Sequence, residues 1–134
     1  MADEATSPPK KQPPQPMFIY DTRGEWHATK IGRYLWDTRG DYVGFVMGEN
    51  HDVYTASGEW IGNLIPDGRI VRKRAEARRP LLPKIPARPP KPKYLPARSP
   101  LPPMCRDLGF TLIDVLEWEP EIFKRVSDQI QDMD

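Results

Sequence analysis

Short runs in which apolar and polar residues alternate extend from Met17 to about Lys73, with a break every eight residues or so. Alternation with a period of two is typical of half-buried β-strands. The breaks at residues 31–33, 47–50 and 66–68 each contain glycine, and two of them also contain asparagine, aspartate or proline. These residues favour tight turns. The pattern therefore predicts an all-β meander of short strands.

Three segments of this meander repeat one arrangement. Residues 20–26, 36–42 and 54–60 each carry an aromatic residue, a four-residue turn that ends in glycine, an acid and a second aromatic residue. The offsets are 16 and 18 residues, and two of the copies share Asp-Thr-Arg-Gly. Aspartate at the start of a type I turn and glycine at its end predict a β-hairpin with a glycine bulge. The two aromatic residues of each hairpin should then face each other, and their stacked rings are expected to form the core.

A small residue stands two places after the second aromatic residue of every copy. These residues are Ala28, Gly44 and Gly62. Absence of a bulky side chain at the same point of each strand indicates that another backbone or ring packs closely against it.

The phrase FIYDTRG at residues 18–24, repeated with an aromatic, an aliphatic residue and glycine behind it, resembles the bacterial four-fold beta-flower domain family. The resemblance covers residues 17–73 and implies four short hairpins around a pseudo-four-fold axis. A fourth unit opens at Ile70-Val71, but Arg72, Lys73 and Arg74 stand where an aromatic residue and a turn are expected. The family has no established catalytic residues, so the resemblance bears on the fold and much less on function.

Most of the 17 prolines lie outside this domain. Residues 1–16 are expected to be disordered, with polyproline II character. Residues 75–106 form a basic proline-rich arm in which Pro80, Pro83, Pro86, Pro89 and Pro92 recur with the three-residue period of a polyproline II helix. IPARP at residues 85–89 is echoed by LPARSP at residues 95–100. The arm is either a spacer that lies across a neighbouring element or a ligand for an aromatic-lined groove.

Residues 107–134 are acidic and regain helical periodicity. Thr111 and Asp114 predict a short helix over residues 112–117. A second helix should begin at Pro120 and bring Ile122, Phe123, Val126 and Ile130 onto one face. So small a stripe must dock on the β-domain, on another copy of the chain or on a partner.

Composition excludes several classes of protein. One cysteine, Cys105, leaves no intramolecular disulfide, and His27 and His51 cannot form a recognisable structural zinc site with it. The polar, acidic start lacks the apolar stretch of a signal peptide, and no apolar run approaches the length of a spanning helix. We expect a cytoplasmic protein without membrane insertion.

Chemistry-bearing residues are few. Ser57 lies in a turn without the strand-turn-helix context of a nucleophile elbow, and Asp21 and Asp37 are committed as turn caps. His27 stands where the other copies have Val43 and Ile61, so the local acid–base pair in sequence is His51 with Asp52. We predict no enzyme activity, no catalytic, cofactor-binding or metal-binding residues, and no small-molecule substrate.

The sequence thus predicts a hairpin-repeat domain at residues 17–74 that serves as a protein–protein interaction or assembly module. The arm and the C-terminal helix would dock on a partner or another subunit. Exposed aromatic and arginine side chains anchor interfaces, and the predicted partner contacts are Arg79, Leu82, Arg88, Tyr94, Trp118 and Phe123. The alternative is a nucleic-acid-binding accessory protein that uses the basic stretch 69–98. This stretch contains eleven Lys or Arg residues and a single acid, Glu76. Its candidate residues are Arg69, Arg72, Lys73, Arg74 and Arg78.

Overall fold

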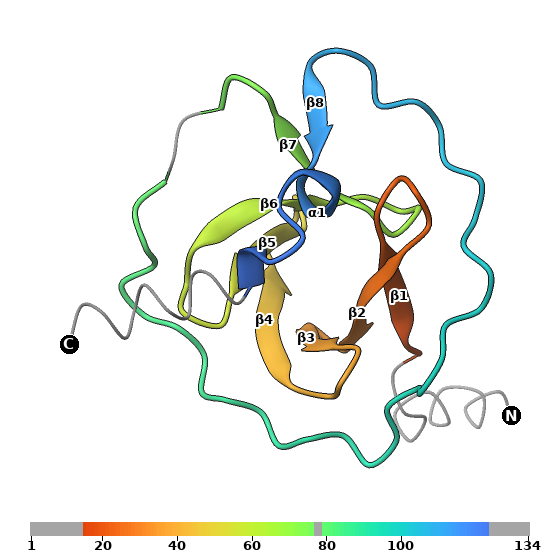
Figure 1. The fold of residues 1–134 in the computed structure, drawn as a ribbon. Coiled ribbons are helices and arrows are strands. Elements are labelled where there is room, and N and C mark those ends of the chain that lie inside the picture. The colour runs from red at the N-terminus through yellow and green to blue at the C-terminus, as the bar shows by residue number, and fades with distance from the viewer. Residues whose placement is uncertain (1–14, 77–78, 124–134) are drawn as a thin grey trace, which may run out of the picture.

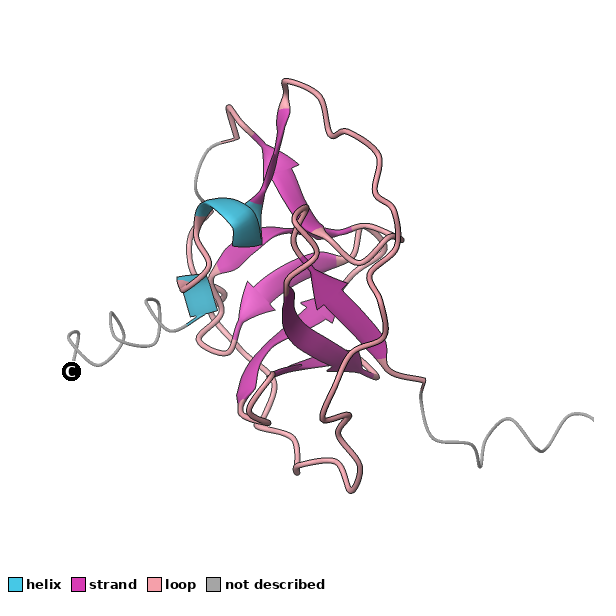
Figure 2. Ribbon diagram, turned by 45° about the vertical axis from the view of Figure 1, so that its right-hand side comes forward, coloured by secondary structure: helices cyan, strands magenta, loops and turns pink. Residues whose placement is uncertain are grey.

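The computed structural model describes residues 15–76 and 79–123. Eight antiparallel strands pair in chain order and form one sheet, which curls into a half-barrel (Figure 1). The strands are β1 (Met17–Tyr20), β2 (Trp26–Ile31), β3 (Tyr34–Asp37), β4 (Tyr42–Met47), β5 (Asp52–Thr55), β6 (Trp60–Leu64), β7 (Ile70–Lys73) and β8 (Leu112–Asp114). Helix α1 (Val115–Trp118) follows β8 directly, and most of the regular structure that Figure 2 draws for the described residues is strand. The predicted all-β meander is confirmed.

The three predicted hairpins are present as β1–β2, β3–β4 and β5–β6. The aromatic residues of each copy are direct partners across the ladder, Tyr20 with Trp26, Trp36 with Tyr42 and Tyr54 with Trp60. A register shift adjoins each pair, as expected for a glycine bulge. The turn glycines have φ of 90°, 92° and 96°, a conformation that side chains with a Cβ rarely adopt.

The core differs from the stacked rings expected from the sequence. The residue just before the first aromatic of each copy, Ile19, Leu35 or Val53, is fully buried in an aliphatic cluster that draws on most strands. Successive side chains of a strand point to opposite faces, so the aromatic residues lie on the other side of the sheet. There Phe45, Tyr54 and Trp60 form a separate, smaller cluster.

Close backbone packing explains two of the recurring small residues. A Cβ on Gly44 would overlap the carbonyl oxygen of Tyr54, and a Cβ on Gly62 would lie 2.6 Å from the carbonyl oxygen of Val71. Both glycines therefore sit where the neighbouring strand leaves no room for a side chain, as the sequence predicted.

The fourth hairpin is completed far along the chain. β7 pairs with β8, so that Val71 is opposite Asp114 and Lys73 is opposite Leu112. Residues 74–111 connect these two strands in the sequence. The predicted helix over residues 112–117 is therefore wrong in its first half, because the edge of β7 offers residues 112–114 a ladder of backbone hydrogen bonds that a weak helix signal cannot match. The helix begins only at Val115, and its N-cap is Asp114, whose side chain accepts a hydrogen bond from the Glu117 amide.

Two predictions fall outside the described residues. The disordered state expected for residues 1–16 concerns a stretch of which only residues 15 and 16 are described. The second helix is described only as far as Ile122 and Phe123, which are both buried in the aliphatic cluster.

Candidate functional site

Residues 79–111, here called the rim segment, contain neither helix nor strand and run around the outside of the curled sheet (Figure 1). The rim segment meets the three repeated hairpin turns in reverse chain order. Leu82 and Ile85 lie over Gly58, Lys91 and Leu95 lie over Gly40, and Pro102 lies over Gly24. Because glycine has no side chain, each turn leaves a space into which the rim segment packs.

The ten-residue echo in the sequence matches this arrangement. Ile85 and Leu95 hold corresponding positions in the two echoed units, and each lies over the turn glycine of a different hairpin, with Ile85 still 45% exposed. Half-buried residues recur about every third position between residues 82 and 99, as expected when one edge of a polyproline II helix faces a surface. Each unit therefore docks on one hairpin.

Polar contacts hold the rim segment at several points along its length. The Leu82 amide donates to the Gly58 carbonyl at 3.1 Å, and the Tyr20 hydroxyl donates to the Pro100 carbonyl at 2.9 Å. At the end of the segment, Arg69 Nη2 donates to the Arg106 carbonyl at 2.8 Å. The rim segment is thus held at its beginning, its middle and its end.

Substitution of Leu82 by aspartate should release the beginning of the rim segment. Leu82 packs half-buried against the Phe45, Tyr54 and Trp60 cluster, so loss of its contact should cost about 1–1.5 kcal/mol, roughly half the value for a fully buried leucine. We expect trypsin to cleave after Lys84 roughly tenfold faster in Leu82→Asp than in the wild type. The control is Leu81→Asp, because Leu81 is an exposed neighbour. Equal cleavage rates in both variants would contradict the docking.

The outward side of the rim segment exposes large apolar side chains. Tyr94 is 84% exposed, Leu101 92%, Met104 100% and Phe110 88%. Between residues 84 and 106 the segment also carries six cationic residues and no acid. These cations are Lys84, Arg88, Lys91, Lys93, Arg98 and Arg106. We call these exposed apolar and cationic residues the rim surface.

The six predicted partner contacts lie in different environments. Arg88, Tyr94 and Trp118 are exposed, and Trp118 has the Arg74 guanidinium 5.1 Å from its ring centroid. The other three pack against the β-domain, although Arg79 is also exposed. The Arg79 guanidinium lies 3.9 Å from the ring centroid of Trp60, Leu82 packs on the aromatic cluster, and Phe123 is buried with the aliphatic core. Helix α1 likewise buries Val115 and Leu116 in the core of its own chain.

The basic residues proposed for nucleic acid are also dispersed. Arg69 is only 1% exposed, and its guanidinium donates to Asp67, to the Thr22 hydroxyl and to the Arg106 carbonyl. Arg74 donates to the Phe110 carbonyl. Arg72 is half-buried and Lys73 is exposed, whereas Arg78 lies outside the described residues.

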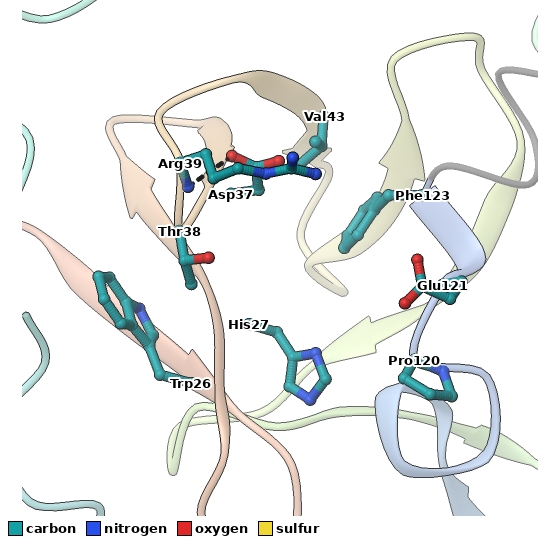
Figure 3. Close-up of a pocket in the computed structure, with 9 residues that line it drawn as sticks. All are labelled: Trp26, His27, Asp37, Thr38, Arg39, Val43, Pro120, Glu121 and Phe123. Carbon is teal, nitrogen blue, oxygen red and sulfur yellow. Dashed lines mark hydrogen bonds between the residues drawn. The ribbon is translucent and has the colours of Figure 1, made fainter. Parts of the chain in front are cut away.

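A pocket of about 440 Å³ lies between the first two hairpins and residues 120–123 (Figure 3). It is lined by Trp26, His27, Asp37, Thr38, Arg39, Val43, Pro120, Glu121 and Phe123. Beside it, His27 Nε2 lies 3.0 Å from Oδ2 of the buried Asp21. The acid–base pair is therefore His27 with Asp21, and the pairing of His51 with Asp52 suggested by their adjacency is wrong. Asp52 instead accepts hydrogen bonds from Trp60 and Asn63.

The environment of Asp21 favours the ionised form of its carboxyl group. Burial alone would raise the pKa of Asp21, but the hydrogen bond to His27 and those from the turn backbone hold the pKa below its ordinary value. The ionised carboxylate accepts, so His27 Nε2 donates. Ligand atoms of Asp21, Glu25 and His27 lie within 4.8 Å of one another, an arrangement that a metal ion could use.

Acid should destabilise the fold partly through Asp21 and Asp67. Burial by itself would raise the pKa of both carboxyls. Hydrogen bonds and the electrostatic effect of the partner, His27 for Asp21 and Arg69 for Asp67, outweigh burial, so the pKa of each carboxyl lies below its ordinary value. A carboxyl whose pKa is lowered in the folded state stabilises the fold above its unfolded pKa of about 3.9, and this contribution is lost as the pH falls below that value. We expect the Tm to drop between about pH 4 and pH 2 and the drop to be smaller in Asp67→Asn. An unchanged drop in that variant, as in the exposed control Asp41→Asn, would contradict this assignment.

Within residues 15–76 and 79–123, no helix is long and apolar enough to cross a membrane. Comparison of the chain with protein-family models, curated proteins and solved structures gave no match.

Proposed function

We propose that this protein is a non-catalytic interaction or assembly module of the cytoplasm, in which the hairpin sheet holds the rim segment extended and presents the rim surface to a protein partner or another subunit. One observation carries the proposal. The same segment that docks on the hairpin turns through Leu82, Ile85 and Leu95 leaves Tyr94 and Met104 almost fully exposed.

Two physical arguments support this function. Several large apolar side chains left exposed along one segment favour protein contact, because their transfer out of water is favourable. An extended segment that is already ordered also loses little conformational entropy on binding, so more of the contact energy appears as affinity. The rim segment combines both properties.

We further propose that the four hairpins are arranged about a pseudo-four-fold axis, as in the four-fold beta-flower family. In support, the three repeated hairpins share one register, and β7 with β8 supplies the fourth hairpin. Under this proposal the degenerate fourth unit carries the rim segment as an insertion between its two strands.

Nucleic-acid binding through residues 69–98 is the rival function. The burial of Arg69 weighs against it, because a phosphate cannot reach a guanidinium whose hydrogen bonds are made within the protein. The test described next separates the two functions.

Site-specific photocrosslinking in the native host tests the proposal. A benzophenone amino acid placed at Tyr94 or Met104 should give a discrete adduct that protease removes and nuclease does not. Met47, which is exposed on β4 and lies outside the rim segment in sequence, is the matched control position. Adducts that form equally at Met47, or that nuclease removes, would rule out presentation of the rim surface to a protein.

A further inference from the structure

The two echoed units of the rim segment share four positions, and contacts account for only some of them. Ile85 and Leu95 pack on turn glycines, and Pro86 and Pro96 are half-buried. Arg88 and Arg98, which also recur, are exposed, and neither makes a hydrogen bond or ion pair with the described residues. The charge of Arg88 opposes the rise in the pKa of the Tyr42 hydroxyl that burial causes, but no hydrogen bond or ion pair within the described residues uses either guanidinium.

We propose that Arg88 and Arg98, with Tyr94 between them, form a docking site for an acidic segment of a protein partner. This inference rests on the proposed function and names the chemistry of the partner. A guanidinium binds a carboxylate through two parallel hydrogen bonds. Tyr94, which is 84% exposed, supplies a rigid aromatic anchor of the kind that dominates interfaces.

Charge on the rim surface is complementary to such a partner. From Lys84 to Arg106 the chain has six cationic residues and no acid, although its formal net charge is only +1. The positive potential is thus concentrated on the rim segment, and this concentration should steer an acidic segment onto the rim surface.

Apolar residues on the same surface favour a protein over a nucleic acid. Leu101 and Met104 are 92% and 100% exposed. Nucleic acids are held by cations and by aromatic rings that stack on bases, and aliphatic side chains provide neither contact. An acidic protein segment that also carries apolar side chains would use the cations and the aliphatic residues together.

Binding of a labelled glutamate–tyrosine copolymer to the full chain, followed by fluorescence anisotropy, tests this inference. Arg88→Ala with Arg98→Ala should weaken binding about tenfold or more, because charge-assisted hydrogen bonds are lost. Arg88→Lys with Arg98→Lys should restore only part of the affinity. The matched control, Lys30→Ala with Arg33→Ala, removes the same charge from β2 and the turn that follows it, and it should change the affinity less than about twofold.

Three outcomes would overturn the inference. The control pair could weaken binding as much as the rim pair, which would indicate net charge alone. A twenty-residue oligothymidylate, or vesicles of phosphatidylserine and phosphatidylcholine, could bind more tightly than the copolymer. The copolymer could fail to bind. Each of these results leaves the photocrosslinking test of the proposed function intact, because crosslinking at Met104 does not depend on the charge of the partner.

Discussion

Alanine at position 44 should lower the free energy of unfolding by about 3 kcal/mol or more, among the largest effects of any single methyl group in this protein. Gly44 lies in β4, where its neighbour β5 passes so closely that a Cβ would overlap the Tyr54 carbonyl oxygen. That atom belongs to the backbone ladder and cannot rotate away as a side-chain atom could. Urea unfolding followed by tryptophan fluorescence measures the loss.

The matched control for this variant is Gly32→Ala. Gly32 has φ of 63°, and a methyl group added to its Cα would meet no other atom within 4 Å. The variant should therefore lose only the cost of a left-handed alanine, about 1 kcal/mol. If Gly44→Ala proves no less stable than Gly32→Ala, then β4 and β5 are not packed as closely as the structure has them.

Arg69→Met should lower the free energy of unfolding by about 3–5 kcal/mol, because it leaves a partly buried carboxylate without its charged partner. The Arg69 guanidinium donates to Asp67 at 2.8 Å, to the Thr22 hydroxyl at 3.1 Å and to the Arg106 carbonyl at 2.8 Å. It thereby joins the β6–β7 turn to the first hairpin turn and to the rim segment. Thermal unfolding of the variant measures the effect.

A double variant identifies the cause of that loss. Arg69→Met with Asp67→Leu removes the unpaired carboxylate as well, so part of the stability should return. Arg39→Met, in an exposed turn position, should change the free energy of unfolding by no more than about 0.5 kcal/mol. A double variant less stable than Arg69→Met alone would show that the Asp67 side chain has another stabilising role.

Local chemistry made the first three hairpins predictable. An aspartate or threonine at the start of the turn, a glycine at its end and five residues between the paired aromatics specify the hairpin within seven residues. The Asp21 and Asp37 carboxylates accept backbone hydrogen bonds in their turns, as their positions implied. The small residues at positions 44 and 62 likewise reported the close approach of the next strand.

Long-range packing hid the rest. No local signal marks residues 112–114 as a strand, because their partner is β7, on the far side of the rim segment. The sequence also did not show which face of the sheet forms the aliphatic cluster. Ile19 and Tyr20 are both apolar, and only the curl of the sheet decides which of them enters that cluster.

The candidate site was partly visible in the sequence. The repeat at residues 85 and 95 was evident in the sequence. Its structural role became clear only from the structure, in which Ile85 lies over Gly58 and Leu95 lies over Gly40. Asp21 lies opposite Glu25 at the end of the first hairpin, so His27, two residues further on, is its diagonal neighbour on the same face. The predicted register of the hairpin was therefore the signal from which the acid–base pair could have been found.

The partner strand of β7 has a consequence for how the protein is made. A ribosome synthesises residues 70–73 well before residues 112–114. Until then the backbone hydrogen-bonding groups on the outer edge of β7 have no strand to pair with. Pairing of strands separated by so long a connection is slow, because the entropy of closing the loop is lost before any hydrogen bond between the strands forms. Chains truncated before Leu112 should therefore retain an edge open to association with other chains.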